Sequence, residues 1–326
     1  MSTGQANTAE ERCILNTFDP PLSLERHPQE LLQQAAEEVI RGAPPKELYT
    51  HSRNEHLGGL FSGPTGLAYL FLHLSVSHPK LRVEGKTPLH WAKAYINGER
   101  HGLPDQLNSC GIITERLCHE AVRASITKDL NHVRSFVSSL TPVIAPSVEG
   151  QSEPYPTEGL YGRSGALYLL RMVRHFVPSS AALLERAIVL LTDRILATDD
   201  DGKGNWTWDG TRYLGPAHGD IGILTQLVLT TPPLAPNLAG KLEELLTLQL
   251  PDGNWPTIPE KTESKLVQWC HGAPGFVLCL LSLRPFFPTL HEKIDFAIER
   301  GRACTWKKGL LKKEPSLCHG ILSNSL

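Results

Sequence analysis

The sequence predicts an all-α fold in which helical hairpins are arranged as an α/α barrel. Two observations predict it. A short glycine motif recurs along the 326-residue chain at intervals of 48 to 57 residues, and each copy opens an apolar stretch. Between the copies lie segments with helical periodicity and one polar face. A repeated pair of helices, one apolar and one amphipathic, closes into a ring with the apolar helices inside.

The six copies of the glycine motif differ in sequence but share one glycine at the start of the apolar helix. These glycines are Gly63, Gly111, Gly162, Gly219, Gly272 and Gly320. Pro64 and Pro274 fall in the first helical turn, where proline is tolerated because its missing N–H has no partner there. We expect the preceding loops (141–160, 199–217 and 251–268) to converge on one face of the ring and to carry the function.

The amphipathic segments between the copies are predicted to form the outer helices. They comprise residues 31–40, 181–197, 237–250 and 289–304. Only six residues follow Gly320, so the sixth inner helix is expected to be cut short and the chain to be truncated at its C-terminus. An open solenoid of helix pairs is the alternative arrangement.

Composition excludes several classes of protein. The net charge is −2, from 32 basic and 34 acidic residues, which gives no reason to expect a nucleic-acid partner. The N-terminus is polar, and no run reaches the roughly 18 apolar residues of a membrane span. Seven cysteines are an odd number and argue for reduced thiols. We therefore expect a cytoplasmic protein without an integral membrane segment.

Cysteine and histidine recur within the repeat. Cys270 and Cys318 each begin a Cys-His-Gly tripeptide, and Ala-His-Gly stands at the equivalent position 217–219. Cysteine and histidine from neighbouring loops are typical zinc ligands, and three protein ligands leave a fourth position for substrate. Cys118, Cys279 and Cys304 fall in apolar helical stretches and are assigned to packing. Cys110, which precedes a motif glycine without a histidine, stays open as a ligand.

Four segments together resemble the LanC family, most closely its eukaryotic LanC-like (lanthionine synthetase C-like) branch. They read GLYGR at 159–163, AHG at 217–219, WCHGAPG at 269–275 and GLLKKEPSLCHG at 309–320. The resemblance runs from about Gly59 to the C-terminus and implies an α/α toroid with inner and outer helix rings. Six of the seven glycine-motif repeats are present. We expect residues 1–25 to be an extension and residues 26–326 to be a single toroid domain without its C-terminal hairpin.

The resemblance implies zinc-dependent thioether formation. Members of this branch add the thiol of glutathione to dehydroalanine or dehydrobutyrine residues in proteins or peptides. By motif match, Cys270, Cys318 and His319 would hold the zinc ion, with His271 as a rival for the metal. His218 would supply the proton to the α-carbon.

Glutathione carboxylates would be bound by basic residues near the loops, with a solvated basic turn as the other interpretation. The candidates are Lys312, Lys313 and Arg163. Bacterial cyclases of the family carry an aspartate where Tyr155 stands here and an arginine where Leu266 stands. Both differences favour the glutathione-using branch.

Two other classes of function compete with this enzyme. The main alternative is a non-catalytic scaffold or regulatory protein that binds zinc and glutathione. The expected truncation favours this alternative, because an unclosed ring can bind metal without turnover. Another α/α-barrel enzyme, such as a glycosidase or a prenyltransferase subunit, is the second. Its carboxylates would have to come from Glu158, Asp209, Asp220 or Asp252, none of which recurs as the Cys-His motif does.

Overall fold

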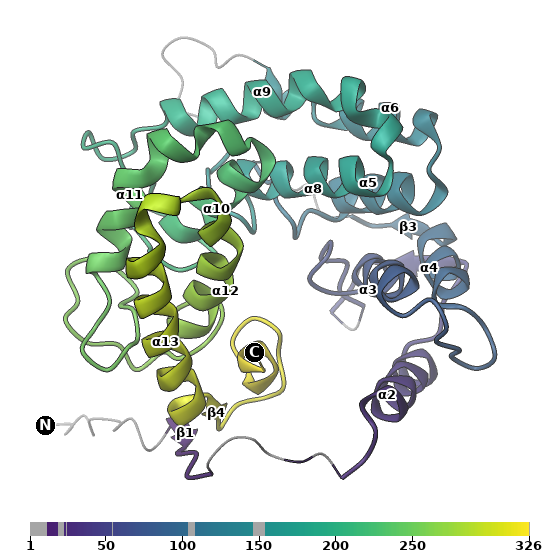
Figure 1. The fold of residues 1–326 in the computed structure, drawn as a ribbon. Coiled ribbons are helices and arrows are strands. Elements are labelled where there is room, and N and C mark those ends of the chain that lie inside the picture. Colours follow the sequence, from purple (N-terminus) through teal and green to yellow (C-terminus); the bar gives the residue numbers. More distant parts are fainter. Residues whose placement is uncertain are drawn as a thin grey trace, which may run out of the picture. The chain divides into compact units, whose positions relative to one another are not determined.

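A computed structural model describes residues 12–18, 23, 25–53, 55–103, 108–145 and 154–325 of the chain. Within these residues there are twelve α-helices, five 3₁₀ turns and four strands of two or three residues (Figure 1). The prediction of an all-α fold is therefore confirmed. The chain divides into two compact units, an N-terminal unit of residues 20–156 and 160–193 and a C-terminal unit of residues 1–19, 157–159 and 194–326.

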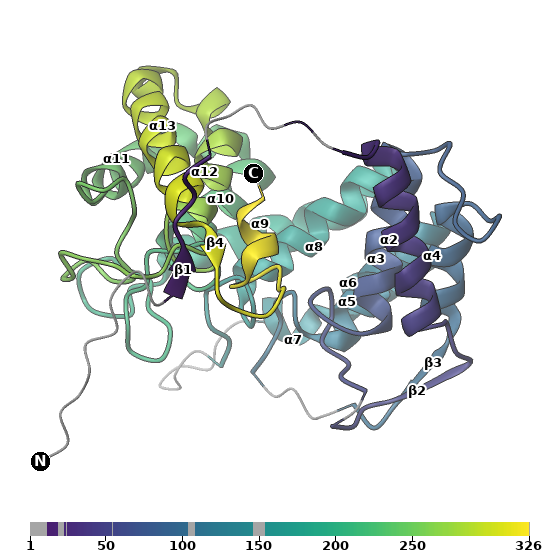
Figure 2. The same ribbon diagram turned by 90° about the horizontal axis from the view of Figure 1, so that it is seen from below.

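The N-terminal unit is built from helical hairpins. Its helices are α2 (Pro28–Gly42), α3 (Pro64–Ser77), α4 (Pro88–Asn97), α5 (Glu115–Thr127), α6 (Leu130–Ser139), α7 (Thr141–Ile144) and α8 (Arg163–Phe176). The α3 helix packs against α4, and α5 packs against both α6 and α8 (Figure 2). The strands β2 (Leu48–Thr50) and β3 (Glu99–His101) pair in parallel beside them. The α9 helix (Ala181–Ala197) follows the 3₁₀ turn η1 (Pro178–Ser180) and contains the boundary between the units.

The C-terminal unit repeats the hairpin pattern. Its helices are α10 (Asp220–Thr230), α11 (Ala235–Thr247), α12 (Ala273–Leu283) and α13 (His291–Lys308). The α10 helix packs against α11 and α12, and α12 packs against α13. The 3₁₀ turns η2 (Pro232–Leu234), η3 (Arg284–Phe286) and η4 (Pro288–Leu290) join the helices of each hairpin. The predicted outer segments 181–197, 237–250 and 289–304 thus correspond to α9, α11 and α13.

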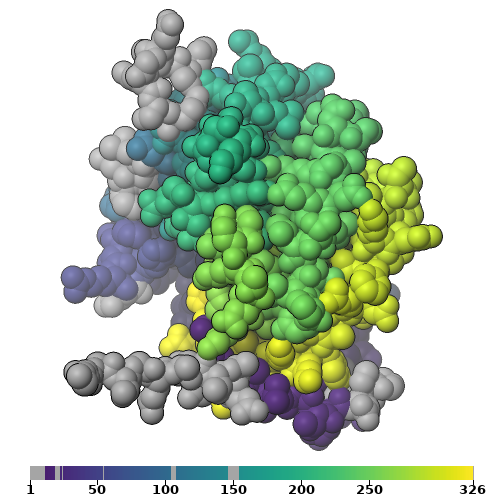
Figure 3. All heavy atoms as spheres, turned by 90° about the vertical axis from the view of Figure 1, so that its left-hand side faces the viewer, coloured from purple at the N-terminus to yellow at the C-terminus, as the bar shows by residue number. Residues whose placement is uncertain are grey.

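The first described residues of the chain lie against its last ones. The β1 strand (Cys13–Ile14) pairs antiparallel with β4 (Leu310–Leu311). The amide of Asn16 donates to the carbonyl of Lys307 at 3.0 Å, and the amide of Lys312 donates to the carbonyl of Arg12 at 2.9 Å. Figure 3 shows purple N-terminal residues against the yellow end of the chain. Residues 12–16 therefore hold the segment that leads to the second Cys-His-Gly motif.

The repeated glycines mark where helices begin. Gly63, Gly162, Gly219 and Gly272 are the residues immediately before α3, α8, α10 and α12. Gly63 and Gly272 have φ angles of 84° and 116°, which only glycine adopts without strain. The second motif differs, because α5 begins at Glu115 after Thr114 and not after Gly111. The short helix expected after Gly320 is a 3₁₀ turn, η5 (Ile321–Asn324).

Two Asp-Gly loops end the outer helices of the C-terminal unit in the same way. Trp206, in a DGKGNW loop, donates its indole N–H to the carbonyl of Ile195 at 2.8 Å. Trp255, in a DGNW loop, donates to the carbonyl of Leu245 at 3.0 Å. Each indole donates to a carbonyl in the last turn of a helix, where the regular amide partner four residues later is missing. Trp255 also stacks on Phe276, with ring centroids 4.4 Å apart, so it links α11 to α12.

Among the described residues, no helix is both long and apolar enough to cross a membrane. The predicted count of six of the seven glycine-motif repeats and the predicted single toroid domain of residues 26–326 stay predictions.

We expect Trp255→Ala to lower the free energy of unfolding by about 3–5 kcal/mol, because it removes a fully buried ring and an indole hydrogen bond. Urea denaturation followed by far-ultraviolet circular dichroism measures the loss. Trp306→Ala is the matched control, since Trp306 is 40% exposed. Equal losses for the two variants would contradict the packing role given to Trp255.

Candidate metal centre and active site

Cys270, Cys318 and His319 form a cluster in the C-terminal unit. Their Sγ and ring-nitrogen atoms all lie within 4.8 Å of one another. Cys270 lies in the turn before α12, and the other two lie in the turn before η5. Both cysteines are buried, whereas His319 is exposed. Within the described part of the chain, this is the one group of three or more Cys, His, Asp or Glu side chains that could hold a metal ion.

Backbone hydrogen bonds bring the two Cys-His-Gly motifs together. The amide of Cys270 donates to the carbonyl of Cys318 at 3.1 Å. Asn324, in η5, donates its side-chain amide to the carbonyls of Val267 and Gly309 at 2.8 and 3.0 Å. These bonds fix the segment before Cys270 against the segment around Cys318, although 48 residues separate the two cysteines.

A buried asparagine shapes the turn that carries Cys270. Asn254 is fully buried; its Oδ1 accepts from the amide of Ala273 at 2.7 Å, and its Nδ2 donates to the carbonyl of Leu266 at 3.1 Å. It thereby satisfies one of the unpaired amides at the start of α12. Gly272 lies in the same turn, where a Cβ atom would come within 2.2 Å of the carbonyl of Leu266. The turn thus excludes any larger residue at position 272.

The two thiols influence each other's protonation. A hydrogen bond from Cys318, opposed by burial and supported by Gln268, lowers the pKa of Cys270 to about 7. The same hydrogen bond, together with burial, raises the pKa of Cys318. Of the two thiols, Cys270 is therefore the one that loses its proton more readily. A thiolate is the form of cysteine that binds soft and borderline metals.

Gln268 connects the cluster to one of the predicted lysines. Its Nε2 donates to the Sγ of Cys270 at 3.2 Å, and its Oε1 accepts from Nζ of Lys313 at 3.4 Å. Such a partner orients a metal-binding sulfur and adjusts its charge. Lys312 and Lys313 are both exposed. Both lysines are predicted to bind substrate. The hydrogen bond to Gln268 places the side chain of Lys313 next to the cluster.

His218 lies in the turn before α10 and is held on two sides. Its Nδ1 is 2.7 Å from Oε2 of Glu158, a side chain that is 1% exposed. Since a carboxylate oxygen accepts, Nδ1 carries the proton. The imidazole also stacks on the indole of Trp208, with centroids 4.0 Å apart and planes 6° from parallel. The ring of His218 therefore has one defined orientation and a defined tautomer.

The turn with His218 packs closely on the turn with Cys270. A Cβ atom on Gly215 would lie 2.2 Å from the carbonyl of Cys270, and one on Gly275 would lie 2.4 Å from Cγ of Pro216. The rings of His218 and His271 are 6.4 Å apart. The predicted proton donor and the predicted metal ligands therefore belong to one region of the C-terminal unit.

A hairpin and an ion pair support this turn. Asp209 and Gly210 have positive φ angles and close a tight hairpin between Trp208 and Thr211, which holds Trp208 against His218. Arg212 forms an ion pair with the buried Asp220 at 2.7 Å, at the start of α10. Burial raises the pKa of Asp220 in spite of this arginine.

His271 faces the same region but is not a member of the cluster. Its ring lies 5.5 Å from that of Tyr213, and its Nδ1 is buried without a hydrogen-bond partner in the described chain. Burial, followed by the charge of His218, lowers the pKa of His271 to about 4. Between the two histidines that the sequence leaves as rivals for the metal, His319 is the one placed beside both cysteines.

The remaining sequence candidates lie elsewhere. Arg163 is the first residue of α8 in the N-terminal unit, where its side chain is buried. Cys110 is buried in the same unit, and its amide donates to the carbonyl of Tyr161 at 2.6 Å. Burial raises the pKa of Cys118, Cys279 and Cys304, as expected for cysteines that serve packing.

Sequence reasoning overlooked the polar partners of the site. Glu158 was considered only as a carboxylate of a glycosidase, although it forms the closest described contact of His218. Asn254 and Gln268 lie in the predicted functional loop 251–268, but no repeated pattern marks them. Only their position in that loop could have drawn attention to them.

Comparison with known proteins finds a matching family model and several related proteins. A family model described as "Lanthionine synthetase C-like protein" matches residues 121–326. The zebrafish (Danio rerio) protein named glutathione S-transferase LANCL1 is 28% identical over 294 residues, which cover 81% of this chain and 67% of the relative. The Arabidopsis thaliana LanC-like protein GCL1 is 32% identical over 177 residues, which cover 51% of this chain and 40% of the relative. The chain thus spans about two thirds and two fifths of their lengths.

Gly272→Ala is expected to displace the turn that carries Cys270, because the added methyl group would collide with the carbonyl of Leu266 and with Asn254. Metal affinity and the midpoint of thermal unfolding should both fall. Zinc titration against a competing chelator measures the first and differential scanning fluorimetry the second. Gly240→Ala is the control, since it lies in α11 with no atom within 4 Å of an added Cβ. A substitution at 272 as harmless as this control would contradict the account of the turn.

Proposed function

The chain belongs to the lanthionine synthetase C-like protein family, and on this premise we propose that it adds the thiol of glutathione to dehydroalanine or dehydrobutyrine residues in a zinc-dependent reaction. The product is a thioether of the lanthionine type. One observation carries the proposal: a Cys-Cys-His cluster and a carboxylate-held histidine lie on three turns of one unit, and the turn with Cys270 contacts both of the others.

The cluster has the composition and size of a zinc site. In a tetrahedral zinc site the ligand atoms are about 3.3–3.8 Å apart, so donors within 4.8 Å need only small side-chain movements to share one ion. Two sulfurs and one nitrogen are a frequent ligand set for zinc, and three protein ligands leave a position for substrate. A bound zinc ion would supply Lewis acidity that favours the thiolate form of a thiol at that position.

The chain's own residues account for the proton that the addition requires. The thiol loses its proton, its sulfur forms a bond to the β-carbon, and the electron pair of the double bond moves toward the α-carbon and its carbonyl. The α-carbon then takes up a proton, so that one S–H is added across one C=C. His218 is suited to this transfer because Glu158 fixes the Nδ1–H tautomer and leaves Nε2 free to accept the proton that the thiol loses. The imidazolium formed in this way then delivers a proton from Nε2 to the α-carbon.

Glutathione is the proposed thiol. The zebrafish relative is named a glutathione S-transferase, and this name is what supports the substrate here. The tripeptide carries two carboxylates, and the exposed ammonium of Lys313, linked to Cys270 through Gln268, is positioned to bind one of them. Lys312 is proposed as a further contact.

The purified chain is expected to contain one zinc ion bound through two sulfurs and one nitrogen. Replacement by cobalt should give thiolate-to-metal charge-transfer absorption, which Cys318→Ser should weaken and His319→Ala should leave largely in place. Cys304→Ser is the control, because that buried thiol lies outside the cluster. Absence of the charge-transfer band in the wild-type chain would rule out the site.

Turnover is tested with glutathione and a dehydroalanine peptide, followed by the mass of the adduct. His218→Ala should keep the zinc content and reduce the addition rate by about 10²–10⁴-fold. Glu158→Gln should give a smaller loss, because a neutral amide still contacts Nδ1 but no longer favours the same tautomer. Zinc binding without any addition in the wild-type chain would support the alternative, a zinc- and glutathione-binding scaffold. An unchanged rate in His218→Ala would remove His218 from the mechanism.

A further inference from the structure

A cavity of about 570 Å³ opens in the N-terminal unit, formed by the end of α4, the strand β3 and one face of α5. It belongs to a different unit from the metal cluster, and the proposed reaction uses none of its residues. Its volume is within the range of small-molecule pockets in proteins. Charged side chains and backbone carbonyls make up much of its lining.

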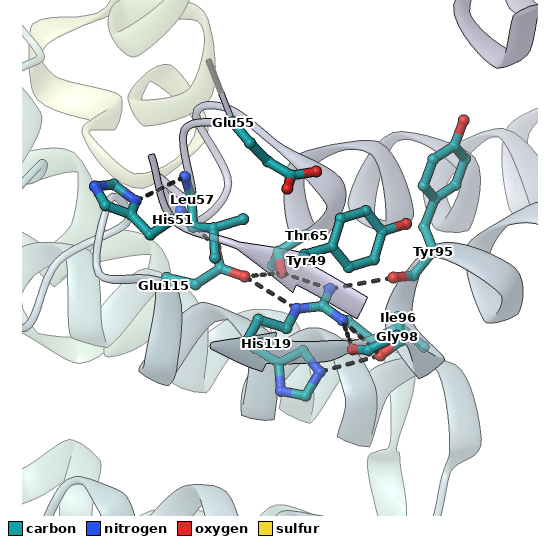
Figure 4. Close-up of polar contacts among 12 residues, drawn as sticks. Tyr49, His51, Glu55, Leu57, Thr65, Tyr95, Ile96, Gly98, Glu115 and His119 are labelled. Atoms are coloured by element: carbon teal, nitrogen blue, oxygen red, sulfur yellow. Dashed lines mark hydrogen bonds and ion pairs between the residues drawn. The ribbon is translucent and has the colours of Figure 1, made fainter. Parts of the chain in front are cut away.

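The floor of this cavity is rigid because Arg100 is locked in place. Its Nε donates to Oε1 of the fully buried Glu115 at 3.3 Å. Its Nη2 donates to Oγ1 of Thr65 at 3.2 Å and to the carbonyl of Tyr95 at 3.1 Å, and its Nη1 donates to the carbonyl of Gly98 (Figure 4). With its charge paired and its donors engaged, Arg100 supports the cavity and has little capacity left for a ligand.

His119 adds a hydrogen-bond acceptor to the wall. Its ring nitrogen Nε2 is 3.0 Å from the carbonyl of Ile96, so Nε2 carries the proton (Figure 4). Burial, followed by the charge of Arg100, lowers the pKa of His119 to about 4, and the ring is therefore neutral near pH 7. In this tautomer Nδ1 accepts hydrogen bonds from N–H or O–H groups.

Three other charged side chains line the cavity and have no ion pair within the described chain. Arg116, Glu120 and Arg123 lie with His119 on one face of α5, since they are spaced by three or four residues. Oε2 of Glu120 is buried and has no hydrogen-bond partner among the described residues. Both arginines are exposed. An unpaired carboxylate oxygen costs free energy. Because the Glu120 side chain is only half-buried and lines the cavity, a ligand that donates to its carboxylate would offset that cost.

We propose that this cavity binds a short acidic peptide or a similar zwitterion, with its ammonium group at Glu120 and its carboxylates at Arg116 and Arg123. The positions of the charges select this class. A simple anion would meet the carboxylate of Glu120, and a simple cation would meet two guanidinium groups. Seven residues of helix separate the two arginines, which places their Cα atoms about 10 Å apart along α5. A dipeptide with acidic side chains can reach both.

The test is isothermal titration calorimetry of the full chain with L-glutamyl-L-glutamate and with its N-acetylated form, which lacks the ammonium group. The free dipeptide should bind at least about tenfold more tightly than the acetylated one, as expected for a hydrogen-bonded charge pair at a buried carboxylate. Glu120→Gln keeps the shape of the side chain and should abolish this preference. Arg116→Gln and Arg123→Gln should weaken binding of both peptides.

Glu185→Gln and Arg302→Gln are matched controls, because both residues are exposed and lie outside the cavity. Circular dichroism verifies that every variant is folded. If Glu120→Gln does not fold, the two arginine variants still test the proposal, because their side chains are exposed. No binding of the free dipeptide at about 10 mM, or a preference that persists in Glu120→Gln, would overturn the proposal. The proposal would also be overturned if Arg116→Gln and Arg123→Gln bound the dipeptides as tightly as the control variants do.

Discussion

The hydrogen bond between the amide of Cys270 and the carbonyl of Cys318 is the contact on which the candidate metal centre depends. A metal cluster needs donor atoms within a few ångströms, and here they come from two turns 48 residues apart. Side chains alone would not hold two such turns together at a fixed distance. Pairing of the backbones does, and Asn324 and Asn254 add hydrogen bonds that fix each turn from its other side. The proximity of the three donor side chains is thus a property of the fold.

Small residues make this arrangement possible. The turn before α10 approaches the turn before α12 so closely that a Cβ on Gly215 would collide with the carbonyl of Cys270. At position 215 glycine is needed because a side chain would collide with the neighbouring turn, although the backbone angles suit any residue. At position 272 a side chain would collide, and the positive φ angle also favours glycine. Glycine in these turns therefore has a functional consequence. Gly215 and Gly275 let the turns before α10 and α12 touch, and so bring His218 near Cys270.

The sequence predicts the parts of this site that repeat and misses those that do not. Cys270 and Cys318 occupy the same position in successive motifs, and His218 occupies the next position, which is equivalent to His319, so the period itself indicates that they belong together. Glu158, Asn254 and Gln268 each contribute one polar group to a neighbour far away in the sequence or in a non-repeating loop. Neither spacing nor amphipathic pattern encodes such contacts, because they depend on how the loops fold. The same holds for the bonds that the carboxylate of Glu115, the first residue of α5, forms with Arg100, Thr65 and the amide of Gly59.

Buried carboxylates in this protein have different partners, and the difference indicates what each one does. Glu115 forms an ion pair with Arg100 and accepts a hydrogen bond from Thr65, so its role is structural. Glu158 has a histidine as its described partner, and an imidazole can pass a proton onward where a guanidinium cannot. Glu120 has a buried oxygen with no partner in the described chain, so neither role accounts for it. A folded chain retains such an uncompensated group at a cost in stability, and the cost is recovered only when something else binds there.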